Sequence, residues 1–311
     1  MDQAGKALRV GFIGLGDIGA PMAERIVKGG FPLLVWNRTA AKMQALVDAG
    51  AERAASPADL ARRVDVVCLC VTDDKAVEEV VFGADGIASL GRADHIVCDH
   101  STIHPITTRA LAQRLEQACG ATWLDIPISG GSIGARAGTL AAFGGGDATA
   151  IERVRPVIAS FAATFTRMGD SGCGQATKSC NQMINVGTVA AIAEAMNFGS
   201  RFGLDVSKLP EALAGGFADS SILRNYAPKM AAGTFSGSTL TTLKDLNIVL
   251  DVARQTDSAL PVISMLASFY RMLIARGYSE DGMAGMMRMY TEQPLKPAAT
   301  PSTPSPSTPT L

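Results

Sequence analysis

Hydrophobic positions in the first half of the chain form short runs that alternate with amphipathic stretches. Runs of mainly aliphatic residues predict strands at residues 9–13, 32–36, 64–71, 95–98, 122–126 and 140–143. Several runs are apolar at successive positions, which is typical of strands covered by helices on both faces. We expect helices between them, one capped by Ser56 and another beginning near Pro105. This order predicts an α/β unit with an open, doubly wound, mostly parallel sheet.

The pattern changes near residues 169–172. Only isolated glycines interrupt residues 175–202, which predicts one helix of about 28 residues and about 42 Å. Further helices are expected at 207–214, 240–255 and 261–276, with no comparable strand pattern after residue 170. We therefore predict an α/β domain over residues 1–172 and an all-helical domain over 173–293, entered by a long interdomain helix. Residues 294–311 are rich in proline, serine and threonine, which predicts a disordered tail.

Charge and composition narrow the classes of partner. The chain has 28 lysines and arginines against 29 acids, so no general basic surface is expected for nucleic acid or an anionic membrane. No apolar run approaches the roughly 20 residues that a membrane span needs. The first residues resemble neither a secretion signal nor a transit peptide, and the six cysteines are scattered. These observations predict a cytoplasmic protein.

A glycine-rich turn directly follows the first predicted strand, with Gly14, Gly16, Asp17, Ile18 and Gly19 in the pattern G-x-G-x-x-G. The first glycine permits a tight turn, and the second lets the backbone approach a pyrophosphate. The third allows close packing of helix on strand, and the N-terminus of the helix faces the phosphates. The segment therefore predicts a dinucleotide-binding loop.

The end of the second predicted strand bears on which dinucleotide is bound. NAD-specific proteins usually place an acid there to bind the ribose hydroxyls, but this chain has Asn37, Arg38 and Thr39. Asn37 has no charge to repel a 2′-phosphate, whereas Arg38 and Thr39 are able to bind one. The segment favours NADP over NAD.

A polar stripe lies on the long helix. Lys178, Asn181, Gln182 and Asn185 follow the spacing i, i+3, i+4 and i+7 and share one face, while Met183, Ile184 and Val186 belong to the part expected to be buried. One charge and three amides are unlike an ordinary solvated face, so the stripe indicates a ligand-binding surface. A lysine there can protonate the oxygen that becomes an alkoxide when hydride reaches an aldehyde. An ordinary surface lysine is the alternative interpretation.

A second glycine-rich segment, at residues 125–132, also follows a predicted strand, where open α/β sheets place their ligand crevices. Ser129, Gly130 and Gly131 expose backbone N–H groups suited to a carboxylate, although a plain loop remains the alternative. The three histidines have no cysteine or carboxylate at a metal-binding spacing, so we expect no metal site.

Together these motifs resemble the β-hydroxyacid dehydrogenase family, which includes 3-hydroxyisobutyrate dehydrogenase and 2-hydroxy-3-oxopropionate (tartronate semialdehyde) reductase. The resemblance runs from about residue 10 to about residue 288 and rests on ordered motifs at 11–16, 101–103, 127–131, 174–182 and 244–246. It implies an N-terminal NADP-binding Rossmann domain, a C-terminal helical domain for substrate binding and dimerisation, and a homodimer or homotetramer.

The resemblance also implies roles for single residues. Lys178 matches the catalytic lysine, residues 129–131 match the loop for the substrate carboxylate, and Asn181 and Gln182 match its partner amides. Asp245 is implied to orient the lysine before it. The positions implied for cofactor contact are Val71, Thr72, Thr102 and Lys244.

Two departures from the family pattern leave the substrate open. Gln182 stands where 3-hydroxyisobutyrate dehydrogenases often have asparagine, and residues 235–239 lack a Pro-Gly-Phe run whose phenylalanine can line the substrate pocket. We expect NADP-linked interconversion of a small hydroxy acid and its aldehyde-acid. The alternatives are an imine reductase, which usually lacks a lysine at position 178, and a non-catalytic NADPH-binding module.

Overall fold

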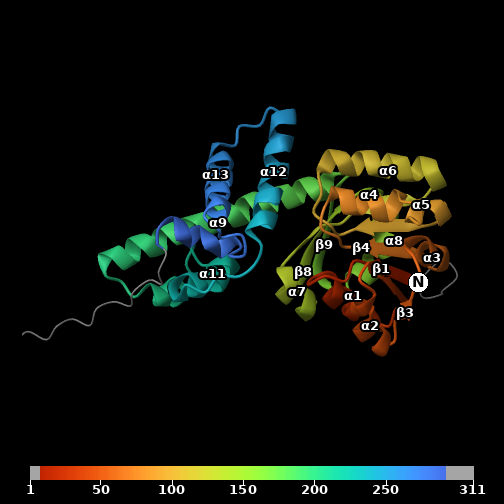
Figure 1. Cartoon of the computed structure of the whole chain (residues 1–311), viewed down its shortest axis with the longest axis horizontal. Helices are drawn as coiled ribbons and strands as arrows, with labels where there is room; N and C mark the ends of the chain where they lie inside the picture. The colour runs from red at the N-terminus through yellow and green to blue at the C-terminus, as the bar shows by residue number, and fades with distance from the viewer. Residues whose placement is uncertain (1–7, 292–311) are drawn as a thin grey trace, which may run out of the picture. The chain divides into compact units, whose positions relative to one another are not determined.

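The predicted apolar runs pair into one sheet. The computed structural model describes residues 8–291 (Figure 1), so the tail expected at 294–311 lies outside the described residues. The strands are β1 (Val10–Ile13), β2 (Leu33–Trp36), β3 (Glu52–Arg53), β4 (Val66–Leu69), β5 (Ile96–Asp99), β6 (Thr122–Asp125), β7 (Ile128–Ser129), β8 (Leu140–Gly145) and β9 (Ala162–Gly169).

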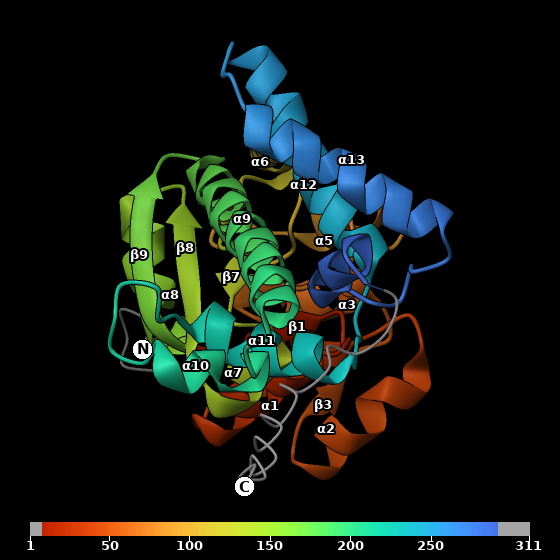
Figure 2. The same cartoon turned by 90° about the vertical axis from the view of Figure 1, so that its left-hand side faces the viewer.

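The order of the strands is β3-β2-β1-β4-β5-β6-β8-β7, with β9 paired to β8. All pairs from β3 to β6 are parallel, and β8 is antiparallel to β6 and β7. Figure 2 shows β9 beside β8, to which it is parallel. The order 3-2-1-4-5-6 is that of a Rossmann fold, so the predicted doubly wound, mostly parallel sheet is confirmed. The carboxyl ends of β1, β4, β5 and β6 therefore lie at one edge.

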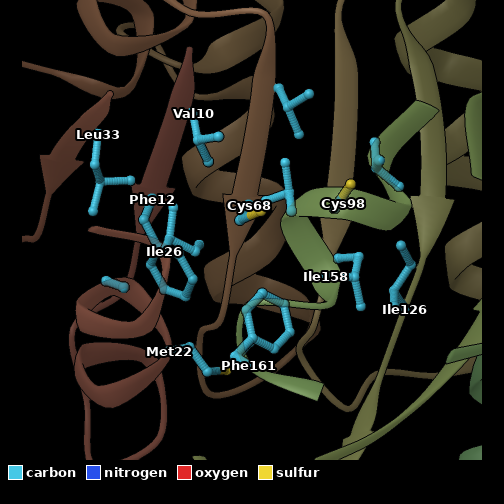
Figure 3. Close-up of a cluster of buried hydrophobic side chains, with 14 of the residues drawn as sticks. Val10, Phe12, Met22, Ile26, Leu33, Cys68, Cys98, Ile126, Ile158 and Phe161 are labelled. Carbon is cyan, nitrogen blue, oxygen red and sulfur yellow. The ribbon is translucent and has the colours of Figure 1, made fainter. Parts of the chain in front are cut away.

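Helices cover both faces of this sheet. One face packs against α1 (Gly19–Lys28), α2 (Gln44–Asp48), α7 (Gly131–Ala137) and α8 (Ala148–Ile158). The other packs against α3 (Pro57–Arg63), α4 (Asp74–Phe82), α5 (Ile87–Leu90) and α6 (Pro105–Cys119). Because side chains alternate along a strand, Phe12 and Cys68 lie in the first core (Figure 3), while Ile13 and Leu69 lie in the second.

Two predicted helix starts are confirmed. The hydroxyl of Ser56 accepts a hydrogen bond from the backbone N–H of Asp59 at 3.1 Å, which caps α3. Helix α6 begins at Pro105, where a missing N–H costs nothing because the first turn has no acceptor for it.

The chain divides into compact units, residues 1–181 and 182–311. The division falls inside α9 (Cys173–Phe202), a single helix of 30 residues that matches the predicted long helix. The second unit continues with a 3₁₀ turn (Val206–Lys208), α10 (Leu209–Ala212), α11 (Ser221–Ala232), α12 (Thr239–Gln255), α13 (Pro261–Ala275) and a 3₁₀ segment (Met283–Met289).

Helices α12 and α13 lie side by side and share a core with α9 and α11. Through residue 291 this unit has helices and one isolated bridge, Gly237 to Asp281, but no named strand, so the predicted helical class is confirmed. None of the helices within residues 8–291 has the length and apolarity needed to cross a bilayer.

The helix expected at 207–214 is wrong in extent, because Pro210 lies in the first turn of α10 and separates it from the preceding 3₁₀ turn. Helix α11 was not predicted, since Pro228 lies inside it. Strand β9 also escaped prediction: most of its side chains are exposed, so its sequence carries no apolar alternation.

The expectation that the apolar part of α9 is buried is wrong at Ile184, whose side chain is 67% exposed. Val186 is buried as expected, in the core of the second unit. The apolar residues of α9 therefore form two different surfaces, one facing the core and one facing outward.

Candidate functional site

The glycine-rich turn has the geometry of a dinucleotide loop. Gly14 has φ +95°, and a Cβ there would overlap the carbonyl oxygen of Cys70. A Cβ on Gly19 would overlap the carbonyl oxygen of Gly14, so this glycine lets α1 pack against the turn. Gly16, by contrast, is exposed and has open space where its Cβ would be. The backbone requires the first and third glycines, and the second leaves room for a ligand.

The ends of three neighbouring strands meet beside this turn. The N–H of Cys70, after β4, donates to the carbonyl of Ile13 at 2.9 Å, and the N–H of Val71 donates to the hydroxyl of Ser101 at 3.0 Å. These bonds bring Val71 and Thr72 to the turn and place Thr102 along the same edge. Thr72 is exposed and Thr102 half-buried, so neither is hidden in the core.

Asn37 joins the end of β2 to the glycine turn. Its Oδ1 accepts from the N–H of Leu15 at 2.9 Å, and its Nδ2 donates to the carbonyl of Thr39 at 3.0 Å. This structural role was not predicted, since the sequence indicated only that Asn37 lacks charge. An aspartate would keep the first bond but could not donate the second.

Arg38 and Thr39, which follow Asn37, are both exposed. Arg38 has no ion-pair partner within residues 8–291, so its guanidinium is available to an anion there. The residues at this edge fit a dinucleotide: an open second glycine lies at the start of a helix, and a guanidinium stands at the strand end where a 2′-phosphate is read.

Lys178 is placed near the second glycine-rich loop. It lies in the second turn of α9 and is only 9% exposed. Its Nζ donates to the carbonyl oxygen of Ile128 at 2.8 Å, one residue before Ser129. Gly130 and Gly131 are exposed and have φ of +125° and +60°. The structure thus brings the predicted acid/base residue to the loop predicted to hold a carboxylate.

The remaining members of the polar stripe have different neighbours. Asn181 is half-buried on α9. In the second unit, Gln182 is 5% exposed, and its Nε2 donates to Oδ2 of Asp245 at 2.5 Å. Asp245 also lies 3.3 Å from the ammonium of Lys244. Asp245 therefore contacts both the predicted substrate amide and the predicted cofactor lysine.

Asp125 and Gln175 were not predicted as site residues. The carboxylate of Asp125 accepts from the N–H of Gly172 at 2.8 Å and from the N–H of Gln175 at 2.9 Å. Burial raises the pKa of Asp125, while these N–H donors oppose the shift. A sequence signal did exist, because a carboxylate ends the apolar run at residues 122–126.

The described residues also bear on whether the protein holds a metal ion. Across residues 8–291, no group of three histidine, cysteine, aspartate or glutamate side chains is arranged to hold a metal ion.

A Rossmann sheet with an open dinucleotide turn, together with a buried lysine at the start of the helix that leads into a helical unit, defines the class of nicotinamide-dependent oxidoreductases. Residues 9–169 match the family model described as the NAD binding domain of 6-phosphogluconate dehydrogenase. Residues 172–290 match the model described as NAD-binding of NADP-dependent 3-hydroxyisobutyrate dehydrogenase. The chain belongs to the β-hydroxyacid dehydrogenase family.

Relatives cover nearly the whole chain. The 2-hydroxy-3-oxopropionate reductase of Escherichia coli is 34% identical over 88% of this chain and 94% of its own length. The mitochondrial 3-hydroxyisobutyrate dehydrogenase of Homo sapiens is 34% identical over 91% of this chain and 87% of its own. These two relatives carry different substrate names, so they show the family but not one substrate.

Solved structures agree on the fold. The 3-hydroxyisobutyrate dehydrogenase of Salmonella typhimurium is 25% identical with a TM-score of 0.82, covering 91% of this chain and 100% of that one. Psf3, solved with NADP⁺ and 2-OPP, is 27% identical with a TM-score of 0.82, covering 91% and 100%. An imine reductase from Pseudomonas sp., 19% identical with a TM-score of 0.61 over 91% and 99%, shares the fold alone.

Proposed function

We propose that this protein uses NADP(H) to interconvert a small β-hydroxy acid and its aldehyde-acid, of the 3-hydroxyisobutyrate or 2-hydroxy-3-oxopropionate type. Lys178 serves as proton donor and acceptor. The observation that carries this proposal is the buried ammonium of Lys178, bonded to the Ile128 carbonyl beside the Ser129 loop. An ordinary surface lysine would keep its ammonium in water.

Lys178 handles the proton in both directions. In reduction, Nζ gives a proton to the substrate's carbonyl oxygen, which becomes the hydroxyl of the product. In oxidation, the neutral amine takes that hydroxyl proton as the carbonyl forms. The Ile128 carbonyl accepts one N–H of the ammonium, and because an ammonium has three N–H donors, Lys178 can also donate to the substrate oxygen.

The chain's other polar groups bind and orient the reactants. Backbone N–H groups of residues 129–131 hold the substrate carboxylate, and Asn181 and Gln182 orient it. The dinucleotide is held at Gly14, Gly16, Asp17, Ile18 and Gly19, with Arg38 and Thr39 on its 2′-phosphate. When bound, the coenzyme supplies or accepts the hydride. Further coenzyme contacts are assigned to Val71, Thr72, Thr102 and Lys244.

The test compares wild type with Lys178→Met on a panel of semialdehydes, glyoxylate and cyclic imines, following NADPH oxidation. Removing the proton donor lowers kcat by about 10²- to 10⁴-fold, while NADPH binding persists. Lys28→Met removes an exposed lysine paired with Glu24 and is the matched control.

Each outcome of the panel has a meaning. Wild-type turnover of an aldehyde-acid that is lost in Lys178→Met supports the proposal. Near-normal turnover in that variant overturns the role of Lys178. Turnover of cyclic imines alone identifies an imine reductase, and NADPH binding without any turnover identifies a non-catalytic binding module.

A further inference from the structure

We propose that Asp125 is the positioning residue for Lys178: its carboxylate fixes the first turn of α9 to the end of β6, so that the lysine reaches the Ser129 loop. This inference rests on the proposed function, in which Lys178 moves the proton. Every group on which it depends lies within residues 1–181, the first compact unit.

The first step is the bond pair at the start of α9. One carboxylate oxygen of Asp125 accepts from Gly172 N–H and the other from Gln175 N–H, at 2.8 and 2.9 Å. The first turn of a helix leaves N–H groups without partners inside the helix, so an acceptor there stabilises that turn. Asp125 caps α9 as an N-cap residue would, but it comes from a strand about 50 residues earlier.

The carboxylate is also confined. A Cβ on Gly145 would lie 2.6 Å from both oxygens of Asp125, and a Cβ on Gly174 would overlap its backbone carbonyl oxygen. Because both neighbouring residues are glycines, strand β8 and helix α9 approach Asp125 closely. Asp125 therefore has little freedom to move relative to α9.

The second step is a contact made three residues later, at the start of β7. Asp125 holds α9 at Gln175, and the carbonyl of Ile128 accepts from Lys178 Nζ. A shift of α9 by one turn, about 5.4 Å, would break both contacts together.

The third step concerns charge. Asp99 lies directly opposite Asp125 in the pairing of β5 with β6. Burial, with a smaller contribution from the neighbouring Asp125, raises the pKa of Asp99 to about 7. Backbone N–H donors oppose the rise in the pKa of Asp125, so Asp125 is the better of the two sites for a negative charge. The other ionisable groups nearby are His100, whose ring is hydrogen-bonded to the Ile126 carbonyl oxygen, and Arg109, whose Nε donates to the Ser171 carbonyl oxygen. An ionised Asp125 also interacts favourably with the positive, N-terminal end of the α9 dipole.

Gln175 ties the same turn to a second strand end. Its Nε2 donates to the Ser101 carbonyl at 2.7 Å, and its Oε1 accepts from Ile103 N–H at 3.3 Å. Since the Ser101 hydroxyl in turn holds Val71 N–H, the first turn of α9 connects the segment of Lys178 with the edge assigned to the coenzyme.

The experiment compares Asp125→Asn with Asp147→Asn. Asp147 caps α8 through Ala150 N–H at 2.8 Å, so its variant is the matched loss of a charged helix cap on a different helix. We measure Tm, kcat, KM, Kd for NADPH, and the rate at which an amine-acetylating reagent labels Lys178, with exposed Lys28 as the internal reference.

The expected result is a separation between the two variants. Asp125→Asn lowers kcat at least about tenfold and raises Lys178 labelling at least about tenfold, while Kd for NADPH changes less than about twofold. Asp147→Asn lowers Tm but leaves kcat and Lys178 labelling unchanged. If the two variants give equal kcat and equal Lys178 labelling, Asp125 has only a structural role and the proposal is overturned.

A second variant covers the case in which Asp125→Asn does not fold. Gln175→Met removes the side-chain bonds to Ser101 and Ile103 but keeps the backbone N–H that Asp125 binds, so Lys178 labelling should stay within about twofold of wild type. Labelling at least about tenfold faster in this folded variant would show that Gln175 and not Asp125 positions the lysine, which would overturn the proposal. The labelling needs no turnover. A wild type inactive on the whole panel would therefore contradict the proposed function, while Lys178 labelling would still decide the positioning role.

Discussion

Arg38 is the residue on which coenzyme preference is expected to depend. It is exposed at the end of β2 and has no ion-pair partner within residues 8–291. We predict that Arg38→Asp weakens NADPH binding at least about tenfold, because a bidentate contact with the 2′-phosphate is replaced by repulsion. NADH, which lacks this phosphate, changes much less. The measurement is the Kd of each coenzyme by fluorescence titration.

Arg276→Asp makes the same charge change at an exposed position at the end of α13 and is the control. Equal weakening of NADPH and NADH by Arg38→Asp would remove the basis for NADP preference. Asn37→Asp is a second probe, because it keeps the acceptor for Leu15 N–H, loses the donor to Thr39, and adds a charge that disfavours the phosphate.

Asp99 gives a prediction for stability against pH. Burial raises its pKa in the folded protein to about 7 from an ordinary 3.8, so the folded state holds the proton more tightly. The contribution of Asp99 to the free energy of unfolding is therefore fully present below pH about 4 and is lost as pH rises through about 7.

Asp99→Asn stays neutral and keeps an oxygen for Ser101 N–H, so its stability should not fall in that range. Between pH about 4 and about 8, the urea-unfolding free energy of wild type relative to the variant falls by about 2 to 4 kcal/mol. Parallel stability curves for the two proteins would show that Asp99 titrates normally.

Single residues differ in how far the sequence reveals them. Lys178 was predicted from its spacing on one helix, and the first and third glycines of the turn from their local pattern. Asp125 was recognisable only as an acid ending an apolar strand, because its partners lie 47 and 50 residues away. A local sequence pattern cannot predict contacts between residues so far apart in the chain. The hydrogen bond between Asn37 and Leu15 could not be predicted for the same reason.

At the scale of elements, strong periodicity predicted well and weak periodicity did not. The α9 prediction of residues 175–202 lies within the observed Cys173–Phe202, since nothing in that stretch stops a helix. Strand β9 was not predicted because most of its residues are exposed, and helix α11 was not predicted because it contains Pro228. Burial of Ile184 was predicted wrongly because apolar character alone does not distinguish a core face from an exposed face.

The exposed face of α9 follows a regular spacing within the second unit. Ile184, Phe198 and Phe202 are 67%, 71% and 76% exposed, and the rings of the two phenylalanines stack 6.4 Å apart. Thr188, Ala191 and Ala195 lie between Ile184 and Phe198 on the same face. Successive residues of this face are therefore alternately four and three positions apart. Such a heptad-like seam is the pattern by which one helix packs against another.

At the scale of the whole molecule, alternation of strands and helices was enough to predict the Rossmann class, because short crossovers between parallel strands allow few orders. The order and direction of the strands beyond β6 were not predicted. There β8 turns antiparallel to β6, and β7 is only two residues long. The catalytic family followed from ordered motifs spread over both units, whereas the substrate depends on a pocket that no motif describes.

A second copy of this chain is the partner we predict for the seam of Ile184, Phe198 and Phe202, giving the homodimer or homotetramer expected of the family. Large apolar side chains gathered in a stripe are uncommon on the surface of a monomer. The double variant Phe198→Asp with Phe202→Asp buries two charges at the contact and removes two apolar anchors, each worth at least about 2 kcal/mol of binding free energy. We therefore expect it to lower the molar mass measured by light scattering. Phe217→Asp changes a still more exposed phenylalanine outside the seam and leaves that mass unchanged. A monomeric wild type, or a double variant with the wild-type mass, would show that the stripe does not bind a second copy.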